Sequence, residues 1–157
     1  MGLSNKDRIG KALDQLRNGL LPFISRHLEE NLGSSWQNSL PNHSNNLQDI
    51  YVLLGLFMDN WRNIFKKILS NSDRAYVSEL REARDKWAHS NPMSSDDVDR
   101  YLDTAIRLCK NINAVNEAES IRLIREELRQ QIFSERARHR SKYQPTIENK
   151  YRAGLKP

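Results

Sequence analysis

Apolar residues recur every three or four positions along most of the chain, which is the period of an amphipathic α-helix. The first run begins where Ser4 or Asn5 can cap a helix and continues to about Leu28, with Pro22 predicting a kink or a split. Its inward positions are Ile9, Leu13, Leu16, Leu20, Ile24 and Leu28. The polar stretch at 33–46 predicts a loop. His43 in that loop lacks a second metal-binding side chain nearby and is expected at the surface.

The most apolar run predicts a central helix over residues 47–69. Its wide apolar face, which includes the aromatic residues of the run, should pack against several neighbours as core. A third helix is expected to begin at Ser72 or Asp73. It should end by about Asn91, because the residue before Pro92 is displaced from α-helical backbone angles.

A fourth helix is predicted to begin after Ser94, whose hydroxyl precedes Asp96 and Asp97 in the first turn. Capping explains these aspartates better than metal binding does. The inward positions are Val98, Tyr101, Leu102, Ala105, Leu108, Cys109 and Ile112. A fifth helix from about Glu117 should bury Ile121, Ile124, Leu128 and Ile132. With no strand-like alternation, the sequence predicts an all-α bundle of four or five helices.

Charge is unevenly distributed. Residues 1–120 hold 15 Lys and Arg against 16 Asp and Glu, whereas residues 121–157 hold 10 against 4. The apolar pattern fades from Ser134, so we expect a helical domain over 1–133 and a basic linker or tail over 134–157. Such a tail favours an anionic partner, RNA first, or a solvated basic face. The arginines that would form this stripe are Arg122, Arg125, Arg129, Arg136 and Arg140.

Several classes of site are not indicated. The longest apolar run, residues 51–58, is too short to span a bilayer, and without a leader pattern the chain is expected in the cytoplasm, with no membrane partner. The single cysteine, Cys109, is in phase with inward positions and should be a buried thiol. Neither a His/Cys cluster nor a glycine-rich phosphate loop is present, so we expect no metal and no cofactor.

Candidate chemistry gathers at the end of the third predicted helix. Arg84 lies between Leu80 and Trp87 on an otherwise apolar stripe, where a guanidinium needs an anion, a partner chain or water. His89 follows five positions later, and Asp85 is placed to hydrogen-bond its ring. Positions five apart on an ideal helix point about 140° apart. Arg84 and His89 therefore converge only if the helix ends there or if two copies meet.

RNA cleavage suits these residue types. A 2′-hydroxyl that attacks the adjacent phosphate needs a base, an acid and positive charge on the phosphorane, and histidine and arginine supply them without a metal. One protomer offers one such histidine, so an acid–base pair requires a two-fold dimer. The alternative is that Arg84 pairs with a carboxylate such as Glu82 or Asp103, while His89 merely finishes the helix.

The run Arg84-Asp85-Lys86-Trp87-Ala88-His89 resembles the Arg-x4–6-His motif of the HEPN superfamily (higher eukaryotes and prokaryotes nucleotide-binding), including the polar residue after the arginine. More narrowly, residues 79–89 and the segment 94–105 resemble the HEPN subgroup named after a yeast nuclear RNA quality-control endoribonuclease. The resemblance extends from about Asn5 to Leu128.

This resemblance implies a helical bundle that forms a homodimer through the motif helices and, in many members, a metal-independent RNase. Arg84 would bind the scissile phosphate, and His89 would act as acid or base. Supporting roles fall to Asp85 and Glu82, and RNA contacts to Arg81, Lys86, Arg136 and Arg140. In bacteria the subgroup often heads ATP-binding phage-defence proteins, and the closing residues 153–157 resemble the lead-in to their ATPase region.

Two further hypotheses stay open beside the endoribonuclease. Many HEPN domains bind RNA or dimerise without cutting it, so the chain is also a candidate non-catalytic RNA-binding module. It is equally a candidate structural interaction domain with a solvated basic face. One mode of control is not expected, because Asn91 stands where the antitoxin-paired HEPN subgroup has a tyrosine that receives AMP.

Overall fold

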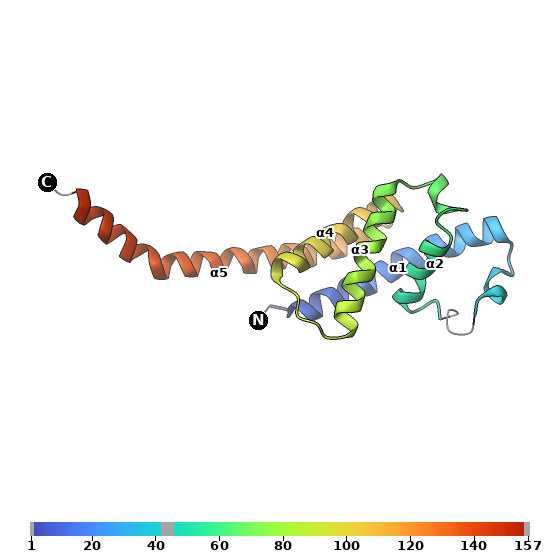
Figure 1. Ribbon diagram of the computed structural model, residues 1–157, viewed down its shortest axis with the longest axis horizontal. Coiled ribbons are helices and arrows are strands. Elements are labelled where there is room, and N and C mark those ends of the chain that lie inside the picture. Colours follow the sequence, from blue (N-terminus) through green and yellow to red (C-terminus); the bar gives the residue numbers. More distant parts are fainter. Residues whose placement is uncertain (1, 42–45, 156–157) are drawn as a thin grey trace.

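The computed structural model describes the backbone of residues 2–41 and 46–155 and the side chains of residues 2–41 and 46–141. The α-helices are α1 (Asn5–Leu32), α2 (Ile50–Asp59), α3 (Asn71–Ala88), α4 (Ser95–Asn111) and α5 (Val115–Leu155), with 3-10 turns η1 (Trp36–Ser39) and η3 (Phe65–Lys67). These residues form no strand, which confirms the all-α prediction (Figure 1).

Helix α1 runs through the bundle and packs against α2, α3, α4 and α5, while α4 lies between α3 and α5 (Figure 1). The core between them is fully apolar at its centre, where Leu16, Leu20, Leu102 and Leu108 are inaccessible to solvent. All seven positions predicted inward on α4 are buried. The C-terminal half of α5 extends beyond the bundle as a single helix.

Hydroxyl caps set the predicted helix starts. Ser4 Oγ accepts from Asp7 N at 3.1 Å, and Ser94 Oγ accepts from Asp97 N at 3.0 Å. Helix α3 begins slightly earlier than predicted, because Ser70 and Asp73 form a reciprocal capping box. Its start is therefore set by Ser70 rather than by Ser72 or Asp73.

Helix α1 is continuous through Pro22, so the predicted split is wrong. Proline removes one backbone donor, which costs one intrahelical hydrogen bond. The inward side chains on either side, Leu20 and Ile24, are both fully buried. Burial of apolar side chains across this turn offsets the lost bond and keeps one helix.

The predicted helix over 47–69 is also wrong, because α2 ends at Asp59. The Asn60 amide still donates to the Leu56 carbonyl at 3.1 Å, but the next amide, that of Trp61, donates to the Met58 carbonyl at 3.2 Å, three residues back, and the α-helical pattern ends. The chain then turns, yet Trp61, Ile64 and Phe65 remain buried. Phe57 and Phe65 stack with ring centroids 4.8 Å apart.

The predicted polar loop at 33–46 contains a short helix. Trp36 in η1 is buried against the core, which the surrounding Ser and Asn residues did not indicate. His43 lies outside the described residues.

Helix α5 begins at Val115, two residues before the predicted start, and the backbone stays helical past Ser134 to Leu155. Ile121 and Leu128 are buried, and Ile124 and Ile132 are half-buried against the core. The end of the apolar pattern thus does not coincide with the end of the helix.

An arginine that the hydrophobic pattern did not single out joins α1 to α5. Arg8 is 1% exposed and donates Nε to Glu127 at 2.9 Å and Nη1 to Asn5 at 2.8 Å. It also donates to Gln131. Because each partner accepts a charge-assisted hydrogen bond, this buried cation is well satisfied.

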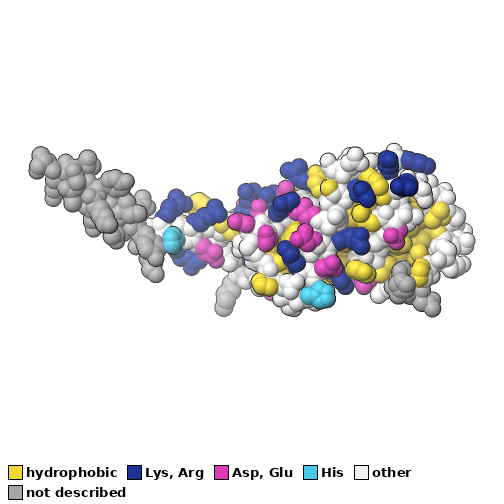
Figure 2. All heavy atoms as spheres, viewed as in Figure 1, with side chains coloured by type: hydrophobic (Ala, Val, Ile, Leu, Met, Phe, Trp, Pro, Cys, Tyr) yellow, Lys and Arg dark blue, Asp and Glu magenta, His cyan; other side chains and the backbone are white. Residues whose placement is uncertain are grey.

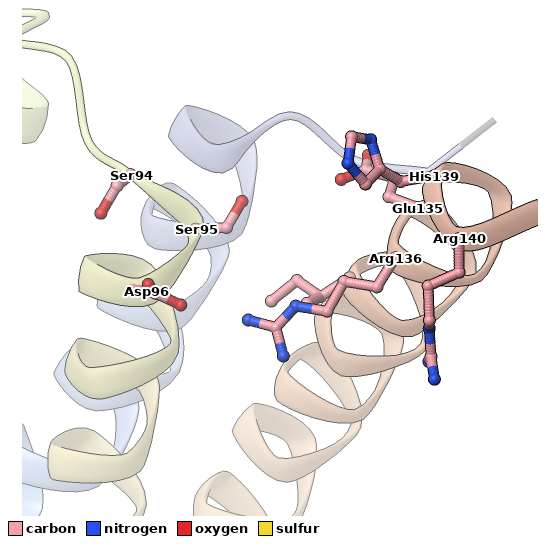
Figure 3. A pocket seen from close by; sticks show the side chains of 8 residues that line it. Ser94, Ser95, Asp96, Glu135, Arg136, His139 and Arg140 are labelled. Carbon is pink, nitrogen blue, oxygen red and sulfur yellow. The ribbon is translucent and has the colours of Figure 1, made fainter. Parts of the chain in front are cut away.

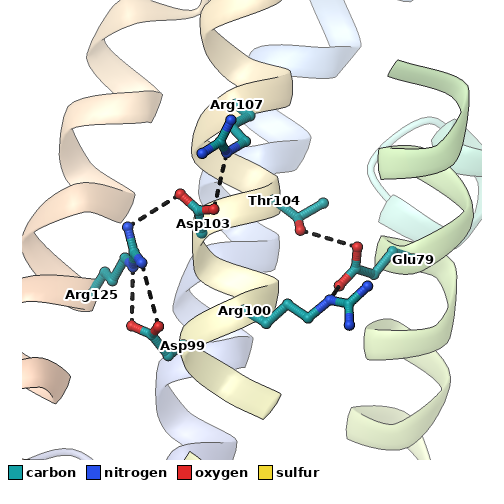
Figure 4. A network of polar contacts seen from close by, with 7 residues as sticks. All are labelled: Glu79, Asp99, Arg100, Asp103, Thr104, Arg107 and Arg125. Carbon is teal, nitrogen blue, oxygen red and sulfur yellow. Dashed lines mark hydrogen bonds and ion pairs between the residues drawn. The ribbon is translucent and has the colours of Figure 1, made fainter. Parts of the chain in front are cut away.

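A second network joins α4 to its neighbours (Figure 4). Arg125 of α5 donates to Asp99 at 3.0 Å and to Asp103 at 3.1 Å, and Glu79 of α3 lies 2.7 Å from Arg100. Arg125 is therefore a packed ion-pair residue, and its predicted place on a solvated basic face is wrong.

The surface mixes both signs of charge over much of the bundle (Figure 2). Within the described residues, none of the helices has the length and apolar character needed to cross a membrane.

Burial raises the pKa of the Cys109 thiol to about 12, so it stays protonated, as predicted for a core residue.

Candidate active site

Helix α3 ends in a tight turn immediately after His89. The His89 amide still donates to the Asp85 carbonyl at 3.0 Å, so His89 keeps the helical register. Ser90 adopts a left-handed backbone with φ 53°, and the Asn91 amide donates to the Lys86 carbonyl at 2.9 Å. This Schellman arrangement stops the helix and confirms its predicted end.

The end of α3 is fixed onto α1. A Cβ at Gly10 would lie 3.0 Å from Trp87 Nε1, so glycine permits the close approach of the Trp87 ring. Lys6 Nζ donates to Ser90 Oγ at 2.5 Å, and Asn5 Nδ2 donates to the Met93 carbonyl at 3.1 Å. His89 therefore projects from a rigid, multiply anchored turn.

The Arg84 side chain is 23% exposed, and its Cζ lies 4.7 Å from the centroid of the Tyr51 ring. Its nearest acid is Asp85, with Nη1 and Oδ1 3.6 Å apart, which exceeds a hydrogen bond. Nε is buried without a partner. Among the described residues, no hydrogen bond forms to any of its five N–H donors.

The carboxylates proposed as alternative partners of Arg84 are engaged elsewhere. Glu82 lies 3.4 Å from Lys86, and Asp103 binds Arg107 and Arg125 at 3.0 and 3.1 Å. Arg84 therefore pairs with neither of them, although it does form an ion pair with another carboxylate, Asp85, at 3.6 Å. Arg84 thus differs from Arg8 and Arg125, whose donors are satisfied, and it keeps donors for an anion.

His89 is exposed at the end of α3. In the described part of the chain its ring takes part in no hydrogen bond, and the one predicted from Asp85 is absent because that carboxylate turns toward Arg84. Asp85 therefore balances the Arg84 charge. The imidazole is left accessible to a substrate, with both ring nitrogens available for proton transfer.

Arg84 and His89 diverge on one protomer. Because His89 retains helical register, the two side chains leave α3 about 140° apart. The end of the helix therefore does not bring the two side chains together on one protomer. A site that uses both residues therefore needs a second copy of the chain.

The residues predicted to contact RNA fall in two places. Arg81 and Lys86 lie on α3, where Lys86 Nζ is 5.7 Å from the Tyr101 ring. Hydrogen bonding to Tyr101 is the largest cause that raises the pKa of Lys86, followed by smaller contributions from Glu82. Arg136 and Arg140 instead lie on α5, outside the motif helix.

Arg136 and Arg140 line a pocket of about 710 Å³ between the start of α4 and α5, in which Arg136 extends toward α4 (Figure 3). Asp96 and Glu135 also line it, so its charge is mixed. Arg84 and His89 do not line this pocket. The predicted catalytic residues and the RNA contacts predicted on α5 therefore lie at different sites on one protomer.

Sequence reasoning missed Tyr51 as a site residue. Its apolar phase assigned it to the core, but the side chain is 50% exposed and lies under Arg84. Among the described side chains, no three His, Cys, Asp or Glu residues gather closely enough to hold a metal ion.

The helical bundle and the arginine–histidine end of α3 place the chain in the HEPN class. A family model described as Swt1-like HEPN matches residues 11–113, from within α1 to just past α4, and the chain belongs to this family. Neither a curated protein nor a solved structure matches the chain. Helix α5 lies beyond the matched residues.

Proposed function

We propose that two copies of this chain form a metal-independent endoribonuclease site from Arg84 and His89. The observation that carries the proposal is the state of Arg84. Its side chain is largely buried and its guanidinium lies on an aromatic ring, with one ion pair to Asp85 at 3.6 Å and no hydrogen bond, so its N–H donors can still bind a phosphate oxygen. HEPN membership supports RNA as the source of that anion, because the family suggests RNase-type or RNA-binding domains.

Each residue has one role in the proposed reaction. The ribose 2′-oxygen attacks the adjacent phosphorus while His89 of one copy removes the hydroxyl proton. The bond from phosphorus to the 5′-oxygen breaks as His89 of the other copy donates a proton to that oxygen. Arg84 binds the non-bridging oxygens, where negative charge develops. The products are a 2′,3′-cyclic phosphate and a 5′-hydroxyl.

Tyr51 supports Arg84 in this scheme. The ring covers one face of the guanidinium at 4.7 Å, and Nε faces the protein interior. The Nη edge is therefore the part left to bind phosphate. Restricting the guanidinium before RNA arrives reduces the entropy lost on binding.

Cleavage of RNA in EDTA tests this proposal. We expect wild-type protein to yield 2′,3′-cyclic phosphate ends and Arg84→Ala to cleave about 10²-fold more slowly. Arg74→Ala is the matched control, because Arg74 is an exposed arginine of the same helix. Equal rates for wild type and Arg84→Ala, or an EDTA-sensitive wild type, would contradict the proposal.

A second candidate is a dimeric RNA-binding module without chemistry. The observation that favours it is the exposed basic part of α5, with Arg136, Arg138 and Arg140 beyond the residues matched by the family model. Such a module would bind RNA with an affinity that falls steeply with salt. It would leave the RNA intact in the EDTA assay, which separates the two candidates.

The wider context is part of the same proposal. We propose that the chain acts in RNA-targeting phage defence in the cytoplasm and that residues 134–157 lead to an ATP-binding region. The resemblance of the motif supports the role in defence, and the resemblance of residues 153–157 supports the ATP-binding region.

A further inference from the structure

A pocket of about 220 Å³ lies beside His89, between the first turn of α1 and the end of α3. Its lining comes from two segments far apart in the sequence, the first turn of α1 on one side and the last turn of α3 with the residues after His89 on the other. The residues that line it are Asn5, Lys6, Lys86, Trp87, Ser90, Asn91, Pro92 and Met93.

The lining includes Lys6 and Lys86 and no acidic residue, but the Lys86 ammonium pairs with Glu82 at 3.4 Å, so the positive charge available to a ligand is that of Lys6. The pocket between α4 and α5 differs in this respect, since Asp96 and Glu135 line it beside its arginines. A concave site with this charge favours an anionic ligand.

The walls of the pocket are held in place without a ligand. Lys6 Nζ bonds Ser90 Oγ at 2.5 Å, and Asn5 Nδ2 bonds the Met93 carbonyl at 3.1 Å. Ser90 holds its left-handed conformation within the turn that ends α3. Binding here needs little reordering of the backbone.

We propose that this pocket binds the RNA backbone phosphate next to the scissile one. The inference rests on the proposed function, because it takes His89 as the place of cleavage. Ser90 follows His89 directly and lines the pocket, so the flanking nucleotide of a strand held at His89 reaches Lys6. Lys6 acts as a point charge on that phosphate.

Binding to a 2′-O-methyl RNA, which lacks the attacking hydroxyl, tests the pocket independently of cleavage. We expect Lys6→Met to weaken binding several-fold and to lower the slope of log affinity against log salt by about 1. Lys6→Arg should restore both. Lys11→Met is the matched control, because Lys11 is exposed on α1 but does not line the pocket. Thermal unfolding of each variant checks that the fold is retained.

Cleavage of ordinary RNA then separates the pocket from the chemistry. Lys6→Met should raise KM and leave kcat unchanged. Equal RNA affinities for Lys6→Met and Lys11→Met, or a wild-type protein that does not bind the RNA, would overturn the proposed phosphate site. If the protein cleaves RNA but its RNA affinity does not depend on Lys6, only the proposed phosphate site is refuted. If the protein never cleaves RNA but its RNA affinity depends on Lys6, only the proposed nuclease activity is refuted.

Discussion

Changing His89 to alanine is expected to slow RNA cleavage by about 10³-fold, as loss of a general acid–base group does. The fold should be retained, because the His89 ring is exposed and the helix end depends on backbone hydrogen bonds. Single-turnover cleavage measures the rate, and thermal unfolding shows whether the variant keeps the wild-type melting temperature.

The glutamine variant sharpens this test. His89→Gln retains hydrogen-bonding groups but cannot transfer a proton near neutral pH, so it should be as slow as the alanine variant. Wild-type activity in His89→Gln would rule out proton transfer by His89.

The largest effect on stability is expected from Arg8→Met, which should lower the free energy of unfolding by about 2–3 kcal/mol. Methionine fills much of the space but leaves Asn5, Gln131 and Glu127 without their donor. Glu127 is 37% exposed, so water hydrates part of the orphaned charge and limits the loss. Urea unfolding at neutral pH measures the change. Lys11→Met, an exposed α1 control, should change stability far less.

The same ion pair predicts a dependence on pH. Hydrogen bonding to Arg8 lowers the pKa of Glu127 below its ordinary value. A lowered carboxyl pKa contributes stability that is complete above the unfolded pKa and is lost as pH falls through the folded one. The difference between wild type and Arg8→Met should therefore shrink in acid. An equal difference at neutral and strongly acidic pH would contradict the role of this pair.

Periodicity predicted the helices well where apolar phase and helix length agree. On α4, the seven predicted inward positions are all buried. The same reasoning failed beyond Asp59, because Trp61, Ile64 and Phe65 are buried through turns and not through a continued helix. The backbone changes there to a hydrogen bond between residues three apart, from the Trp61 amide to the Met58 carbonyl, which a pattern of apolar positions does not indicate.

The site was predictable where the information is local. The spacing of Arg84 and His89 and the proline after Asn91 are visible in the sequence and place both residues at the end of α3. The role of Tyr51 was not predictable, because its contact with Arg84 joins two helices and its apolar phase matches a core position. The ion pair of Arg8 with Glu127 spans 119 residues, so no local pattern indicates it.

A heterodimer with one His89→Ala subunit tests the shared site most directly. Two affinity tags allow this species to be purified, and a doubly tagged wild-type dimer is the control. In the proposed site each cleavage uses the histidines of both copies, so we predict activity near that of the double variant. About half of the wild-type activity would show that each subunit acts alone and would contradict the account.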